Sequence, residues 1–115
     1  MKKNTNLPGS PAPDNANNHH PNSKETFLSI VIPIYNEEKN IDPLYNEIIA
    51  AVNGKYRDFE IIFINDGSTD DSLQQLKNLN SRDPRAKIIN FRKNFGQITA
   101  ISAGFDYCKG DIVVT

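Results

Sequence analysis

Apolar positions along the chain alternate between short continuous runs and helical spacings. Three runs are nearly continuous and rich in β-branched residues, which predicts strands buried on both faces at Phe27–Pro33, Phe59–Asn65 and Ala86–Phe91. A fourth run, 111–115, predicts another strand. Pro33 is expected to end the first strand, because it lacks the N–H that a central ladder would need.

The segment after the first predicted strand has the period of an amphipathic helix. Its apolar residues recur at helical spacing: Ile41, Leu44, Tyr45, Ile48 and Val52. Asp42 followed by Pro43 is typical of an N-cap and a first helical position. Asn53 and Gly54 are expected to stop the helix.

Two further helices are predicted after the second and third strands. Ser68 or Thr69 is expected to cap the second helix, and Gly110 to follow the end of the third. The second helix has its apolar side at Leu73, Leu76 and Leu79. The third is expected to bury one face made of Ile98, Ile101, Ser102, Phe105 and Cys108.

Strands and helices of this length in strict alternation predict an α/β fold. We expect a Rossmann-like parallel sheet with right-handed crossovers and helices on both faces. Residues 26–115 form this one domain, and residues 1–25 are predicted to be a disordered polar tail, because they have too few apolar side chains to offset the entropy lost on ordering.

Composition narrows the functional classes. The chain has 115 residues, 23% of them charged, and a formal net charge of -1, which argues against a nucleic-acid-binding protein. His19 and His20 are expected to be solvated in the tail. The sequence has no signal peptide and no apolar run long enough for a transmembrane helix. The single cysteine, Cys108, is assigned to core packing.

Polar side chains follow three of the predicted strands, in the loops "PIYNEE", "NDGSTDD" and "RKNFGQ". In an open parallel sheet, ligands bind beyond the carboxyl ends of the strands. Because these loops all lie at that edge, we expect them to form one binding site.

The first two loops contain side chains that could contact a nucleoside. Tyr35 with Asn36 and Glu37 is consistent either with a ring stacked on a base or with a polar helix start. Asp66 can accept a hydrogen bond from a base N–H or a ribose hydroxyl. Residues 68–71 are interpreted mainly as a helix start, since neighbouring aspartates near a helix start point about 100° apart and chelate a metal poorly.

The third loop offers positive charge. Arg92 and Lys93, with Asn94 beside them, are consistent either with a phosphate contact or with a solvated basic turn, and Gly96 would let the backbone approach a ligand. Other signatures are missing from the sequence. There is no P-loop, no dinucleotide-binding glycine motif, no zinc spacing and no receiver-domain arrangement of aspartates.

Together, three stretches resemble the inverting family-2 glycosyltransferases, which have the GT-A fold. They are "SIVIPIYNEEKNI", "EIIFINDGSTDDSL" and "RKNFGQITAISAGFDYCKGDIVV", and the resemblance as a whole covers Phe27–Thr115. The third stretch is most similar to the branch that glycosylates polyprenyl phosphates, such as dolichol or undecaprenyl phosphate. The resemblance implies that this chain is the nucleotide-binding half of the fold.

Site residues are carried over from the resemblance motif by motif. Four residues match the loop that holds the donor's nucleoside: Pro33, Tyr35, Asn36 and Glu37. Asp66 matches the carboxylate that contacts the base, while Arg92 and Asn94 match a segment that lines the donor site. The family usually has two aspartates in the second motif, and here Asn65 replaces the first.

The resemblance also implies partners and a cofactor. The expected donor is a UDP- or GDP-linked sugar, and the expected acceptor is a polyprenyl phosphate at the cytoplasmic side of a membrane. Mg²⁺ or Mn²⁺ is expected, with Asp-x-Asp ligands beyond Thr115, so we expect neither metal ligands nor catalytic residues in these 115 residues. Self-association is also expected, because half a sheet exposes core surface. A different glycan acceptor and a non-catalytic nucleotide-binding module are the alternatives.

Overall fold

The computed structural model describes residues 26–56 and 58–114. Its elements, in chain order, are β1 (Phe27–Ile34), α2 (Ile41–Val52), β2 (Asp58–Asp66), α3 (Ser72–Arg82), β3 (Ala86–Phe91), α4 (Gln97–Tyr107) and β4 (Ile112–Val114). The predicted alternation of strands and helices is therefore confirmed. The predicted tail at 1–25, including His19 and His20, lies outside the described residues. Across the described part of the chain, no helix combines the length and apolar character needed to cross a bilayer.

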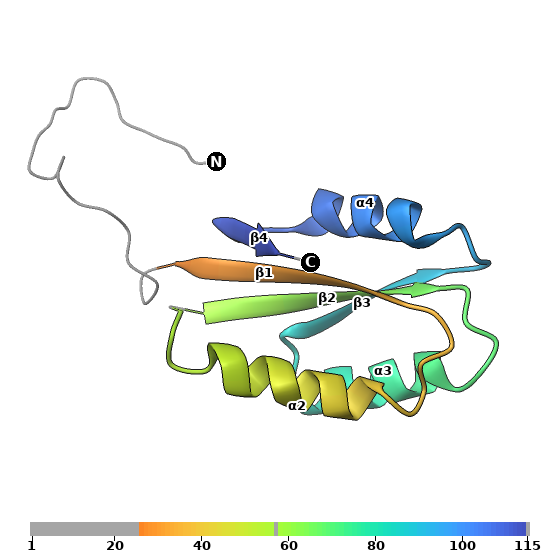
Figure 1. Cartoon of the computed structure of the whole chain (residues 1–115), viewed down its shortest axis with the longest axis horizontal. Helices are drawn as coiled ribbons and strands as arrows, with labels where there is room; N and C mark the ends of the chain where they lie inside the picture. Colours follow the sequence, from red (N-terminus) through yellow and green to blue (C-terminus); the bar gives the residue numbers. More distant parts are fainter. Residues whose placement is uncertain (1–25, 57, 115) are drawn as a thin grey trace, which may run out of the picture.

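All strands of the described residues belong to one parallel sheet with the order β3-β2-β1-β4. The two central strands, β1 and β2, are the most continuously apolar, because a helical layer covers each face of the sheet. Figure 1 shows α2 and α3 on one face and α4 on the other. This arrangement confirms the predicted Rossmann-like sheet with helices on both faces.

Each face of the sheet has its own apolar core. The face toward α2 and α3 buries the larger cluster, built around Phe63, Ile61, Ile41, Leu76 and Leu79. The face toward α4 buries a smaller cluster of Val31, Ile62, Ile64 and Ala100. Each fully buried Ile, Leu or Phe side chain contributes about 1.5–3 kcal/mol to folding, so β1 and β2 hold most of the stabilising contacts.

Two predicted boundaries in the first βα unit are wrong. The strand β1 continues through Pro33 to Ile34. Backbone groups alternate sides along a strand, and Phe27 O accepts a hydrogen bond from Asp111 N ahead of β4. The nitrogen of Pro33 therefore points to the β4 side, and the ladder to β2 loses no donor. The helix α2 begins at Ile41 after Asn40, and Asp42 lies in its first turn.

The predicted buried face of α4 is wrong in large part, although Cys108 is half-buried and packs against the smaller cluster, as assigned. Ile98 and Phe105 are exposed, while Ala100 and Gly104 are buried. A Cβ at Gly104 would lie 2.4 Å from Val31 Cγ1, so the helix approaches β1 too closely for a larger side chain. The helix therefore contacts the sheet through its small residues, and the apolar period alone did not show which side faces inward.

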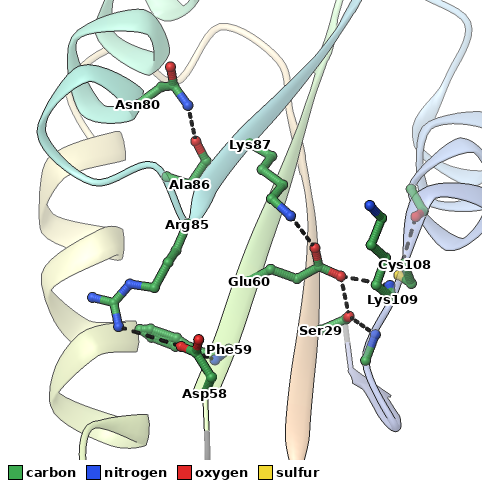
Figure 2. Close-up of polar contacts among 12 residues, drawn as sticks. Ser29, Asp58, Phe59, Glu60, Asn80, Arg85, Ala86, Lys87, Cys108 and Lys109 are labelled. Carbon is green, nitrogen blue, oxygen red and sulfur yellow. Dashed lines mark hydrogen bonds and ion pairs between the residues drawn. The ribbon is translucent and has the colours of Figure 1, made fainter.

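A buried polar cluster lies at the end of the sheet where the strands begin, on the α4 side (Figure 2). The Glu60 carboxylate accepts hydrogen bonds from Lys87 Nζ at 2.8 Å, Ser29 Oγ at 2.6 Å and Lys109 N at 2.7 Å. Burial would raise the pKa of Glu60, but these donors bring it below its ordinary value. Gly110, predicted only as a helix-ending residue, donates from its N to Ser29 Oγ at 2.8 Å. The cluster thus holds the turn that leads into β4.

Candidate functional site

The loops that follow β1, β2 and β3 meet at the carboxyl edge of the sheet, as predicted. They line an open pocket of about 490 Å³, here called the edge pocket. Its lining residues are Pro33, Ile34, Tyr35, Glu37, Asp66, Asn94, Gly96 and Gln97. Five of the seven predicted site residues are therefore brought together, from three loops that lie far apart in the sequence.

The first loop contributes an exposed aromatic ring and an unusual backbone turn. Tyr35 is 46% exposed and lines the edge pocket. Asn36 has φ 53°, in the left-handed region that asparagine enters more readily than most residues. Its Oδ1 accepts from Thr69 N at 2.7 Å, and its N donates to Ser68 Oγ at 3.0 Å. Asn36 therefore joins two loops and does not itself line the pocket.

Hydrogen bonds attach the first loop to the second. Ser68 and Thr69 bond to Asn36, so the prediction that either residue caps the second helix is wrong. The helix α3 begins at Ser72, whose N donates to Asp70 Oδ1 at 2.9 Å. The Ser72 hydroxyl in turn accepts from Glu37 N at 2.9 Å. Short polar side chains in this stretch thus set the position of the first loop.

Asp66 has the most connected side chain of the site. The residue is 3% exposed, and its carboxylate faces the third loop. Asp66 Oδ1 accepts from Phe95 N at 2.7 Å, and Oδ2 accepts from Gly96 N at 3.0 Å and from Asn94 Nδ2 at 3.1 Å. A carboxylate at this position also faces the N-terminal end of α4, where the helix dipole favours negative charge.

Gly67 lets the second and third loops approach each other directly. Its φ is +71°, and a Cβ built there would lie 2.2 Å from the backbone C of Lys93 and 2.3 Å from Asn94 N. A side chain would need the backbone of the third loop to move. The glycine predicted to make a tight turn therefore has a second role, as the contact surface between two loops.

Two residues of the second and third motifs lie outside the edge pocket: Arg92, which is a predicted site residue, and Asn65, which is not. Arg92 is exposed and is not among the residues that line the edge pocket. Asn65, where the family usually has an aspartate, is buried with its Nδ2 donating to Asn90 Oδ1 at 2.9 Å. Side chains alternate along β2, so Asn65 points to the opposite face of the sheet from Asp66.

The edge pocket includes two residues that the sequence patterns did not single out, Ile34 and Gln97, and it includes Gly96, which was expected to let the backbone approach a ligand. Gly96 and Gln97 belong to the start of α4, which opens at the pocket. The signal for them was present, because a helix that follows a strand in a parallel sheet always begins at the carboxyl edge. For metal binding, no three His, Cys, Asp or Glu side chains in residues 26–56 and 58–114 come together as a ligand set.

Comparisons with known proteins agree with this geometry. The family model described as "Glycosyl transferase family 2" matches residues 29–115. The chain is 43% identical over 91 residues to the putative glycosyltransferase CsbB of Bacillus subtilis, which covers 79% of this chain and 28% of that protein. It is 44% identical over 92 residues to an undecaprenyl-phosphate 4-deoxy-4-formamido-L-arabinose transferase of Pseudomonas savastanoi, covering 77% and 27%.

Among solved structures, the chain is similar to a mannosyltransferase from Pyrobaculum calidifontis in complex with GDP-Man and Mn²⁺. The TM-score is 0.69 at 19% sequence identity, over 82% of this chain and 28% of that one. This likeness confirms the predicted fold, part of the GT-A fold of glycosyltransferases. The chain spans little more than a quarter of the length of these relatives. Because the family model covers most of its residues, the chain belongs to glycosyl transferase family 2.

Proposed function

We propose that the edge pocket binds the nucleoside of a nucleotide-sugar donor. The observation that carries this proposal is the meeting of Pro33, Tyr35, Glu37, Asp66 and Asn94 in one pocket of about 490 Å³. A volume of this order suits a nucleotide-sized ligand. The likeness to a mannosyltransferase bound to GDP-Man supports a nucleoside diphosphate sugar as the ligand class.

Each pocket residue has a chemical role in this proposal. The exposed ring of Tyr35 stacks on the base, a contact that contributes about 1–3 kcal/mol in other proteins. Asp66 and Asn94 supply acceptors for N–H or O–H groups of the nucleoside. Arg92, exposed two residues before Asn94, attracts the diphosphate by charge. Asn36 does not contact the ligand in this proposal, but it holds the first loop against the second.

The whole enzyme is proposed to transfer the sugar to a polyprenyl phosphate at the cytoplasmic side of a membrane. Relatives named as undecaprenyl-phosphate sugar transferases support this acceptor. A phosphate oxygen of the lipid would form the new bond at the anomeric carbon, with inversion, as the bond to the nucleoside diphosphate breaks. Mg²⁺ or Mn²⁺, with ligands beyond Thr115, is proposed to neutralise the leaving group. The 115 residues alone are therefore expected to lack transferase activity.

Calorimetric titration of the chain with UDP-sugars and GDP-sugars tests donor binding and identifies the base. Tyr35→Ala should weaken binding of the preferred donor by about 5- to 150-fold, the loss of one stacking contact. Tyr107→Ala is a matched control, because Tyr107 is also exposed but lies at the opposite end of α4. Equal affinity of both variants, or no binding of any nucleotide sugar, would refute the proposal.

A further inference from the structure

The hydrogen-bond donors to the Asp66 carboxylate come from the third loop. Its three hydrogen bonds join two backbone N–H groups and one side-chain amide of the third loop, all within 3.1 Å. A carboxylate has about four acceptor positions, so Asp66 has about one left for a ligand. Without this carboxylate, the N–H groups of Phe95 and Gly96 would lose their acceptor just before α4 begins.

The same contacts determine how the Asn94 amide is turned. Asn94 Nδ2 donates to two oxygens of Asp66, the backbone O and Oδ2, each at 3.1 Å. Both partners are acceptors only, so the reversed amide would set an oxygen against two oxygens. The nitrogen must therefore face Asp66. The amide oxygen, Oδ1, remains for other partners, on a residue that lines the edge pocket.

We propose that Asp66 is a positioning residue, which holds the 94–96 loop so that Asn94 Oδ1 is the acceptor that the pocket presents to the nucleoside. This inference rests on the proposed function, because it names which atom of the pocket recognises the ligand. The chemistry it selects is a hydrogen-bond donor, such as the imide N–H of a uracil or guanine base. Asp66 then acts mainly through Asn94, and its own contact with the ligand is secondary.

The positioning role is tested first without any ligand. Amide hydrogen exchange of the unmodified chain, followed by NMR, should show the Phe95 and Gly96 amides exchanging at least about tenfold more slowly than unstructured amides. Asp66→Asn keeps the shape of the side chain but replaces one acceptor oxygen by a donor. In that variant, exchange at Phe95 and Gly96 should rise by about tenfold, while the core amide of Ile62 stays slow and reports that the chain is folded. Fast exchange in the unmodified chain would overturn the role even if the variant failed to fold.

The presenting role of Asn94 is tested by titration with the preferred nucleotide sugar. Asn94→Ala removes the proposed acceptor but keeps both backbone hydrogen bonds to Asp66. Its affinity should fall by about 5- to 100-fold, with Phe95 and Gly96 still protected from exchange. Asp66→Asn should lose both affinity and protection. Loss of affinity in Asp66→Asn with unchanged protection would instead make Asp66 a direct ligand.

The outcomes separate this inference from the proposed function. If Asn94→Ala binds the donor as tightly as the unmodified chain does, the presenting role is wrong while the pocket stands. If the unmodified chain binds no nucleotide sugar, the proposed function and the presenting role both fail. In that case, protection of Phe95 and Gly96 still decides whether Asp66 holds the loop.

Discussion

Replacing Gly67 by alanine should do more damage than the same change at Gly54. Both glycines have positive φ, +71° and +79°, so each alanine incurs about 1–2 kcal/mol for the left-handed backbone. At Gly54 a Cβ would meet nothing within 4 Å. At Gly67 it would lie 2.2 Å from the Lys93 backbone, where 3.4 Å or more is ordinary contact. Moving the third loop by this amount adds about 1–3 kcal/mol, the usual cost of overpacking.

Urea unfolding of the two variants measures this difference directly. We expect a loss of about 2–5 kcal/mol in the free energy of unfolding for Gly67→Ala, and of about 1–2 kcal/mol for Gly54→Ala. Only Gly67→Ala should also weaken nucleotide binding, because only that change displaces residues that line the edge pocket. Equal destabilisation of the two variants, with equal affinity for nucleotide, would show that the contact between the second and third loops does not matter.

Three further predictions concern other parts of the fold. Hydrogen bonds from Arg85 lower the pKa of the buried Asp83 to about 2, from an ordinary 3.8. Asp83 should therefore contribute about 2 kcal/mol of stability above pH 4, lost as the pH falls toward 2. In acid unfolding, the Asp83→Asn variant should show no such loss of stability. The same pH dependence of stability in the variant and in the unmodified chain would contradict this prediction. Glu60→Gln should destabilise the chain by about 1–3 kcal/mol in urea, because buried donors lose a charged acceptor. Glu47→Gln, at an exposed position, is the control. Equal destabilisation by the two changes would show that the polar cluster around Glu60 does not stabilise the fold. Arg92→Ala should lower nucleotide affinity more at low salt than at high salt, and a salt-independent effect in calorimetry would exclude attraction by charge.

The sheet could be predicted from the sequence because burial on both faces leaves a strong pattern. The run Ala86–Phe91 matches β3 residue for residue. The strand β1 extends one residue beyond its predicted end, and β2 extends one residue beyond its predicted bounds at both ends. The buried side of α4 could not be predicted, because it depends on the distance between helix and sheet. Gly104 allows a close approach to Val31, so small residues face inward and Ile98 remains exposed.

The position of the candidate site could also be predicted, since parallel strands bring the loops that follow them to one edge. The connections among those loops could not. The sequence gives no sign that Asn36 bonds across to Thr69, or that the Asp66 carboxylate is occupied by the third loop. Such contacts join residues about 30 positions apart, and short polar side chains are equally consistent with helix caps, ligands or links between loops.

NMR mapping of amide shifts during titration with UDP-sugars and GDP-sugars tests the central claim most directly. For one of these donor classes, the amide signals of Tyr35, Asn94 and Gly96 should move together and saturate with one dissociation constant. Signals at the opposite end of the sheet, such as Glu60 and Lys109, should stay in place. Saturable shifts centred on Glu60 and Lys109, or no saturable shift around the edge pocket with any nucleotide sugar, would contradict the claim that this pocket binds the donor.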